Sequence, residues 1–176
     1  MSTKLLVTYA SKYGSTQEVA EKVAAILREQ GVAVDLLPAR KVESLDSYSA
    51  VVLGAPLYIG HWHKDAHNFL ERHREALLQR PIAMFTLGPT QPEAQGWDDV
   101  RTQLDQELAK VAWLKPVAFE LFGGRYDPAK LRFPDNLLTW LPTPLRGMPA
   151  SDVRDWDVIR AWAVDLAAKL QPVHAG

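Results

Sequence analysis

The 176-residue chain contains no cysteine. This absence excludes disulfides, thiolate nucleophiles and cysteine-ligated iron–sulfur clusters together, so any redox chemistry requires a bound cofactor. An excess of either charge is also missing, because the formal net charge is only −1. The sequence therefore lacks the basic surplus typical of nucleic-acid binding, and we expect no nucleic-acid partner.

Long apolar runs are missing as well. No uninterrupted stretch approaches the ~20 residues that a membrane-spanning helix needs, and the N-terminus carries no signal-peptide pattern. The sequence therefore predicts a cytoplasmic protein. Hydrophobic residues make up 47% of the chain, enough for one substantial core, and we expect a single domain over residues 1–176.

Short apolar runs alternate with segments of helical periodicity, the order expected for strands and helices around a parallel sheet. The runs are β-branched or aromatic and mostly too apolar to have a wet face, as in strands covered on both sides. Five strands are predicted: Lys4–Tyr9, Val32–Leu37, Ala50–Ala55, Pro81–Leu87 and Pro116–Phe122. The predicted helices are one that ends before Gly31 and buries Val19, Val23, Ile26 and Leu27, and three more over residues 63–78, 98–114 and 157–170, the last capped by Asp155.

One segment interrupts this alternation. Residues 123–151 are dense in glycine and proline but also carry aromatic and aliphatic side chains, which argues against disorder. They form an insert before the last helix, with four basic residues against two acidic ones. Positive charge with apolar bulk suits an anionic tetrapyrrole, a protein partner or peripheral membrane contact through residues 131–148. The alternative is a loop that only covers the core.

The loop Ser11–Thr16 lies where the first strand meets the first helix. Helix N-terminal N–H groups, serine and threonine hydroxyls and the flexible Gly14 together suit a phosphate. The loop is neither the lysine-containing P-loop nor the three-glycine dinucleotide motif, which disfavours nucleoside triphosphates and NAD. The alternative is an ordinary turn in which Ser15 or Thr16 caps the helix.

Two stretches carry a family resemblance. "TYASKYGSTQEVA" resembles the phosphate loop of flavodoxins, which holds the monophosphate of FMN, and Ser11, Gly14, Ser15 and Thr16 match that motif. "YSAVVLGAPLYIGHWHKDAHNFL" is similar to the menaquinone-dependent protoporphyrinogen oxidase branch of flavodoxin-like proteins. The resemblance implies an α/β fold, a flavodoxin-like doubly wound five-stranded parallel sheet of order 2-1-3-4-5 with helices on both faces.

The resemblance also implies FMN as the cofactor and three loops that hold it. The predicted cofactor-binding residues are Ser11, Lys12, Tyr13, Gly14, Ser15 and Thr16 for the phosphate, and Pro56, Leu57, Tyr58, Ile59, Gly60, His61, Thr86, Leu87, Gly88, Pro89 and Trp97 around the ring. The implied function is an oxidoreductase that passes electrons from a reduced organic substrate, a tetrapyrrole in that branch, through FMN to a quinone. Two alternatives stay open: a flavodoxin-type electron carrier that serves a redox partner protein, and an interaction module without tight flavin binding.

Three histidines follow the third strand. His63 and His67 lie one helical turn apart with His61 nearby, a spacing that can present imidazoles to zinc, although no carboxylate or cysteine obviously completes such a site. We expect no metal. His61 is the predicted catalytic residue, because an imidazole beside a reduced flavin can stabilise negative charge or relay protons. A surface histidine is the alternative.

Overall fold

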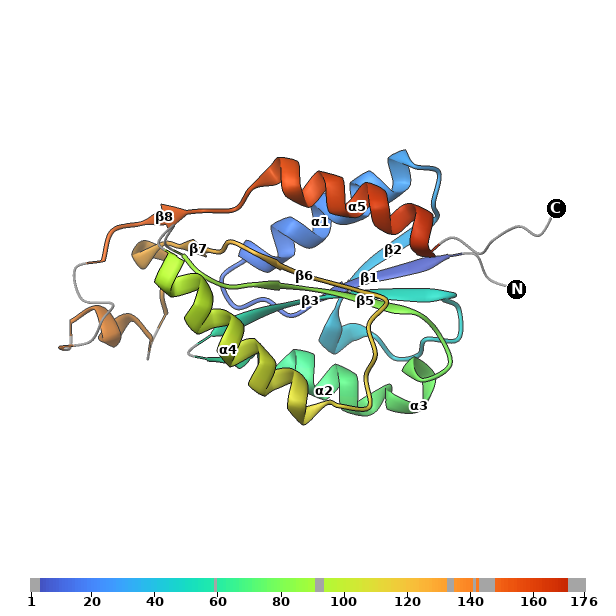
Figure 1. Cartoon of the computed structure of the whole chain (residues 1–176), viewed down its shortest axis with the longest axis horizontal. Coiled ribbons are helices and arrows are strands. Elements are labelled where there is room, and N and C mark those ends of the chain that lie inside the picture. Colours follow the sequence, from blue (N-terminus) through green and yellow to red (C-terminus); the bar gives the residue numbers. More distant parts are fainter. Residues whose placement is uncertain are drawn as a thin grey trace.

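The computed structural model describes residues 4–58, 60–90, 94–132, 135–140, 142 and 148–170, without the side chains of residues 94, 95 and 138. A parallel sheet runs through the middle of the molecule (Figure 1). Its strands lie in the order β2-β1-β3-β5-β6, which confirms the predicted order of the five strands along the chain. These strands are β1 (Leu5–Tyr9), β2 (Val34–Pro38), β3 (Ala50–Tyr58), β5 (Ile82–Leu87) and β6 (Ala118–Phe122).

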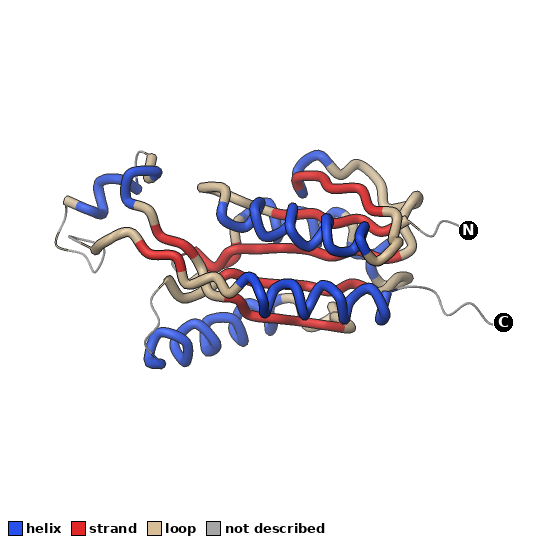
Figure 2. Tube along the Cα trace, turned by 90° about the horizontal axis from the view of Figure 1, so that it is seen from above, coloured by secondary structure: helices blue, strands red, loops and turns tan. Residues whose placement is uncertain are grey.

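Helices cover both faces of this sheet, as predicted. α1 (Ser15–Glu29) and α5 (Trp156–Leu170) lie side by side on one face, and α2 (Lys64–Arg72), α3 (Arg74–Leu77) and α4 (Ala94–Lys110) lie on the other (Figures 1 and 2). Each face has its own apolar core. The predicted inward residues of α1 and α5 are all buried: Val19, Val23, Ile26, Leu27, Ile159, Leu166 and Leu170.

Several boundaries differ from the sequence prediction. The helix predicted over 63–78 is two helices, because the backbone at His73 leaves the helical region where its buried ring binds the carbonyl of Val42 at 3.2 Å. The helix predicted over 98–114 starts at Ala94 and ends at Lys110. β3 continues past Ala55 to Tyr58, since β4 (His61–Trp62) folds back and pairs with it antiparallel.

Asp155 caps α5 as predicted: its carboxylate accepts hydrogen bonds from the N–H groups of Asp157 and Val158 at 3.0 and 3.1 Å. The connection between β2 and β3 holds a single 3₁₀ turn, η1 (Ala39–Lys41).

The described part of the insert has local structure of its own. β7 (Arg125–Tyr126) pairs antiparallel with β8 (Ser151–Asp152), and this ribbon projects from one end of the sheet (Figure 1). Two short 3₁₀ helices, η2 (Pro128–Lys130) and η3 (Asp135–Thr139), follow β7. The insert thus sits at the edge of the sheet where the parallel strands end, the edge at which ligands bind in open α/β sheets. Among the described residues, no helix is both long enough and apolar enough to cross a lipid bilayer.

Candidate functional site

The loop between β1 and α1 is shaped around Gly14. Its φ of 89° lies in the left-handed region, and its N–H donates to the Ser11 hydroxyl at 3.0 Å. Gly14 occupies the N-cap position of α1 without a side-chain cap in the described structure, so capping by Ser15 or Thr16 is not what forms this turn. The first N–H groups of the helix therefore remain available to an anion.

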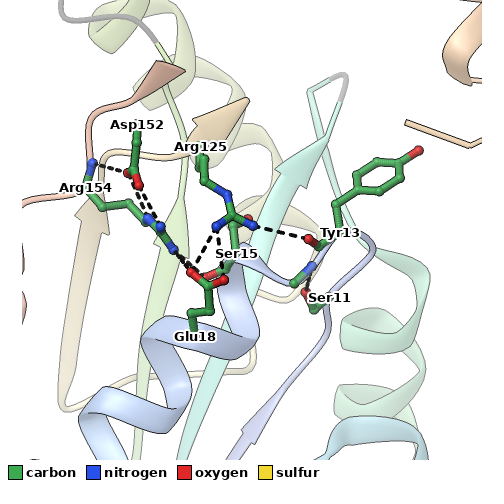
Figure 3. A network of polar contacts seen from close by, with 8 residues as sticks. Ser11, Tyr13, Ser15, Glu18, Arg125, Asp152 and Arg154 are labelled. Atoms are coloured by element: carbon green, nitrogen blue, oxygen red, sulfur yellow. Dashed lines mark hydrogen bonds and ion pairs between the residues drawn. The ribbon is translucent and has the colours of Figure 1, made fainter. Parts of the chain in front are cut away.

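A network of ion pairs links this loop to the insert (Figure 3). Glu18, in the first turn of α1, binds Arg125 of β7 at 3.0 Å and Arg154 at 2.7 Å. Arg154 also binds Asp152 of β8 at 2.7 Å, and Arg125 donates to the carbonyl of Tyr13 at 3.5 Å. Burial alone would raise the pKa of Glu18, but the two guanidinium groups lower it. The β7–β8 ribbon is thus anchored to the start of α1.

A second anchor lies further along the insert. Asp135 of η3 is only 7% exposed, forms an ion pair with Lys12 and accepts a hydrogen bond from the Tyr13 hydroxyl. The Lys12 ammonium also lies 4.6 Å from the ring centroid of Tyr58. Burial alone would raise the pKa of Asp135, but the contacts with Lys12 and Tyr13 lower it. The carboxyl group therefore stays ionised at neutral pH.

Between the β1–α1 loop, the β3–β4 hairpin and the insert lies a largely apolar cavity of about 500 Å³. Its wall consists of Lys12, Tyr13, Ser15, Thr16, Pro56, Leu57, Tyr58, His63, Leu87, Gly88, Thr90, Gly124, Arg125, Tyr126, Asp127, Lys130 and Leu131. The hydroxyl group of Tyr126 is buried without a hydrogen-bond partner in the described part of the chain. A cavity of this size, apolar with a few polar groups, has the character of a cofactor or small-molecule site.

Many of the residues predicted from the sequence meet in this wall: Lys12, Tyr13, Ser15, Thr16, Pro56, Leu57, Tyr58, Leu87 and Gly88. Ser11 and Gly14 shape the adjoining loop instead. Gly60, His61, Thr86, Pro89 and Trp97 do not line the cavity, and Ile59 lies outside the described residues. Thr86 is fully buried and its hydroxyl accepts a hydrogen bond from the Trp62 indole at 3.1 Å.

His61 lies on the outside of the β3–β4 hairpin, with its side chain 69% exposed. Its Nδ1 is 3.0 Å from Glu107 of α4, and Nε2 of His67 is 2.7 Å from the same carboxylate. Glu107 is almost fully buried and also contacts Lys110. Burial alone would raise the pKa of Glu107. Hydrogen bonds from Lys110, His61, the Trp62 N–H and His67 outweigh this effect and lower the pKa to about 2. This cluster ties α4 to the hairpin.

Within the described ranges, no group of three or more His, Cys, Asp or Glu side chains is arranged so that it could hold a metal ion.

Nearly half of the residues in the cavity wall were not predicted from the sequence. His63 lines the cavity in the place expected for His61, and Thr90 directly follows the predicted residues Thr86–Pro89. The insert supplies Gly124, Arg125, Tyr126, Asp127, Lys130 and Leu131. The stretch "GGRYD" was the available signal, because a charged and aromatic segment directly after a strand of a parallel sheet falls at the ligand edge.

A profile of the family described as "Flavodoxin domain" matches residues 6–149. The chain belongs to the flavodoxin family. Solved flavodoxins share its fold: the oxidised flavodoxin 1 of Bacillus cereus superposes with a TM-score of 0.59 at 16% identity, covering 96% of this chain and 99% of that one. Rubredoxin oxygen:oxidoreductase of Desulfovibrio gigas gives a TM-score of 0.56 at 16% identity, covering 96% of this chain but 36% of the larger protein.

Curated relatives of this flavodoxin-domain protein are quinone-linked oxidoreductases. Protoporphyrinogen IX dehydrogenase [quinone] of Escherichia coli K12 is 29% identical over 86 residues, 48% of each chain. The protein of that name from Leishmania major is 23% identical over 175 residues, covering 95% of this chain and 76% of that one. An NAD(P)H dehydrogenase (quinone) of Bradyrhizobium diazoefficiens is 30% identical over 120 residues, covering 53% of this chain and 60% of that one. The match spans about half the length of the first of these relatives.

Membership in the flavodoxin family implies a bound flavin, and the residues present fit FMN. The N-terminus of α1 offers uncapped N–H groups, and a Cβ built at Gly14 would meet nothing within 4 Å, so the backbone there opens into free space. Arg125 adds a cation at the cavity wall beside this loop. Together these donors suit a phosphate, and the apolar remainder of the cavity suits an aromatic ring.

Proposed function

We propose that this flavodoxin-domain protein is an FMN-dependent oxidoreductase that oxidises a reduced organic substrate and delivers the electrons to a quinone. The loop Ser11–Thr16 would hold the phosphate, and Pro56, Leu57 and Tyr58 of β3 with Leu87 and Gly88 would border the ring. FMN supplies the redox chemistry when bound, since it accepts hydride equivalents and releases electrons. The chain itself would bind and orient the flavin and exclude water from it.

One observation carries the choice of an enzyme over an electron carrier. The insert contributes Arg125, Tyr126, Lys130 and Leu131 to the same cavity wall as the phosphate loop. A carrier must bring its flavin close to the surface of a protein partner, whereas an enzyme must also enclose a small substrate beside the flavin. A wall built partly by an anchored insert suits enclosure. The near-neutral net charge of −1 also differs from the strongly acidic surface with which a carrier docks on basic partners.

The names of the curated relatives supply the substrate class for this proposal. A reduced tetrapyrrole is an anionic, largely apolar molecule, and the wall combines the cations Arg125 and Lys130 with the apolar Leu131. Quinones are apolar acceptors that reside in membranes, so peripheral contact of the insert with a membrane through residues 131–148 is part of the proposal. Trp140 supports this contact, because it is 81% exposed in the described part of the insert.

An anaerobic spectroscopic experiment tests the proposal. The protein is loaded with FMN, and its oxidised flavin spectrum is followed after addition of protoporphyrinogen IX and then of a menaquinone analogue. We expect the porphyrinogen to bleach the flavin and the quinone to restore it. Bound FMN that responds to neither would favour the electron carrier, and no FMN binding would refute both.

Two glycines provide a matched pair of variants for the cofactor site. Gly14 and Gly31 have nearly the same left-handed φ, 89° and 82°, and a Cβ at either meets nothing within 4 Å. Gly14→Ala and Gly31→Ala should therefore each destabilise the fold by about 1 kcal/mol, the cost of an L side chain in that region. We expect only Gly14→Ala to weaken FMN binding, because Gly31 lies at the far end of α1.

A further inference from the structure

His63 is held in place by its backbone and by one ring nitrogen. Its N–H donates to the carbonyl of Pro56 on β3 at 3.3 Å, which fixes the residue against the end of the sheet. It also occupies the N-cap position of α2, where its ring Nδ1 accepts a hydrogen bond from the N–H of Asp65 at 3.1 Å. The side chain is 17% exposed and lines the cavity.

The cap determines the tautomer of the imidazole. A nitrogen that accepts a hydrogen bond from a backbone N–H cannot itself carry a proton, so the proton of the neutral ring must be on Nε2. Nε2 has no partner among the described residues, and His63 therefore brings an unused N–H donor to the cavity wall.

The surroundings favour the neutral ring. Burial lowers the pKa of His63 below its ordinary value. The charged groups that face the ring are Asp65, which raises its pKa, and Lys12, Lys64 and Arg40, which lower it. Protonation of Nδ1 would in addition break the cap of α2. His63 is thus a neutral donor at pH 7, in a wall where the cations Lys12 and Arg125 already have the carboxylates of Asp135 and Glu18 as partners.

We infer that His63 is a binding residue of the flavin site, whose Nε2–H donates a hydrogen bond to an acceptor atom on the polar edge of the flavin ring. This assignment rests on the proposed function, since it takes FMN as the occupant of the cavity. A reduced flavin carries more negative charge on that edge than an oxidised one. A hydrogen bond to a charged acceptor is the stronger, so His63 stabilises the reduced form more.

Two substitutions separate the two nitrogens. In His63→Asn the side-chain oxygen reaches only as far as Nδ1, so the cap on Asp65 is kept and the donor to the cavity is lost. In His63→Gln the amide nitrogen reaches the position of Nε2, so a donor is kept and the cap is lost. Asn68→Ala, at an exposed position of α2, is the matched control.

The first readout uses the protein without FMN. Long-range ¹H–¹⁵N NMR spectra of the imidazole groups, assigned by comparison with His63→Asn, should show His63 as the neutral Nε2–H tautomer at pH 7. A proton on Nδ1, or a charged ring at that pH, would overturn the inference.

The second readout is the affinity for FMN in both redox states. We expect His63→Asn to bind oxidised FMN about 3-fold and reduced FMN about 30-fold more weakly than the unsubstituted protein. The difference of about tenfold corresponds to a two-electron potential about 30 mV more negative. His63→Gln should keep most of both affinities and lose stability instead, and Asn68→Ala should change neither. If His63→Asn and the unsubstituted protein bind FMN equally well, the role of His63 is overturned and the proposed function stands. If the unsubstituted protein fails to bind FMN, both the role of His63 and the proposed function are overturned.

Discussion

Replacement of Glu107 by glutamine should destabilise the protein in a way that depends on pH. The carboxylate is about 1% exposed and receives hydrogen bonds from His61 Nδ1, His67 Nε2, Lys110 Nζ and the N–H of Trp62. Its pKa falls from the ordinary 4.5 to about 2. At about 1.4 kcal/mol per pKa unit, this difference corresponds to at most roughly 3 kcal/mol of stability.

Solvent reduces this figure, because the side chains of two donors, His61 and Lys110, are 69% and 52% exposed. We therefore expect Glu107→Gln to lower the free energy of unfolding by about 2 kcal/mol at pH 7. Because the pKa is depressed in the folded state, the stabilisation is complete above the unfolded value of 4.5 and is lost as the pH falls towards 2. The difference between the two proteins should thus be constant from pH 7 to about 5 and shrink below that.

Urea unfolding at several pH values between 7 and 3 measures this difference. Asp105→Asn is the matched control, because Asp105 is an exposed acid on the same helix. Its effect should stay within ~0.5 kcal/mol at every pH. A Glu107→Gln protein as stable as the parent at pH 7, or a deficit that does not shrink on acidification, would refute the idea that the Glu107 carboxylate ties α4 to the β3–β4 hairpin.

Three further substitutions test other contacts. Asp135→Asn removes the ion pair with Lys12, so limited proteolysis should cleave the insert several-fold faster. An unchanged rate of cleavage would mean that this contact does not anchor the insert. Arg125→Gln should weaken the binding of FMN about tenfold and that of riboflavin hardly at all, because the lost cation lies beside the loop Ser11–Thr16 that is proposed to hold the phosphate. Equal losses of affinity in titrations with both flavins would mean that Arg125 acts on the flavin ring instead. His61→Ala tests the catalytic role predicted from the sequence, and an unchanged flavin potential and turnover would remove that role.

The fold was predictable because each element has a strong local signal. The five strands are mostly apolar runs, and the inward residues of α1 and α5 recur at helical spacing, so periodicity separated the two kinds of element. The errors fall where a tertiary contact overrides local propensity. His73 breaks a helix because its ring binds the carbonyl of Val42, and β3 gains three residues because β4 pairs with its end.

The part of the cavity wall that the loop Ser11–Thr16 supplies was predictable for a similar reason, since Ser11, Gly14 and the start of α1 are neighbours in the chain. The part of the cavity wall that the insert supplies was not predictable, because its position depends on where the insert folds back onto the rest of the domain. Arg125 is 107 residues away from Glu18 in the chain, and Asp135 is 122 residues away from Tyr13. Sequence spacing contains no information on such contacts, although a charged segment at the ligand edge indicates that they are possible.

The choice between His61 and His63 shows most clearly what local reasoning lacks. Both histidines flank Trp62, and nothing in "GHWH" distinguishes them. The distinction comes from two partners outside this stretch: Glu107, 46 residues further on, holds Nδ1 of His61 on the outer side of the hairpin, and the start of α2 binds Nδ1 of His63 beside the cavity. A histidine bound by a buried carboxylate is well suited to hold α4 in place. A histidine whose tautomer is fixed by a backbone N–H, with its other nitrogen unpartnered among the described residues, is suited to bind a ligand.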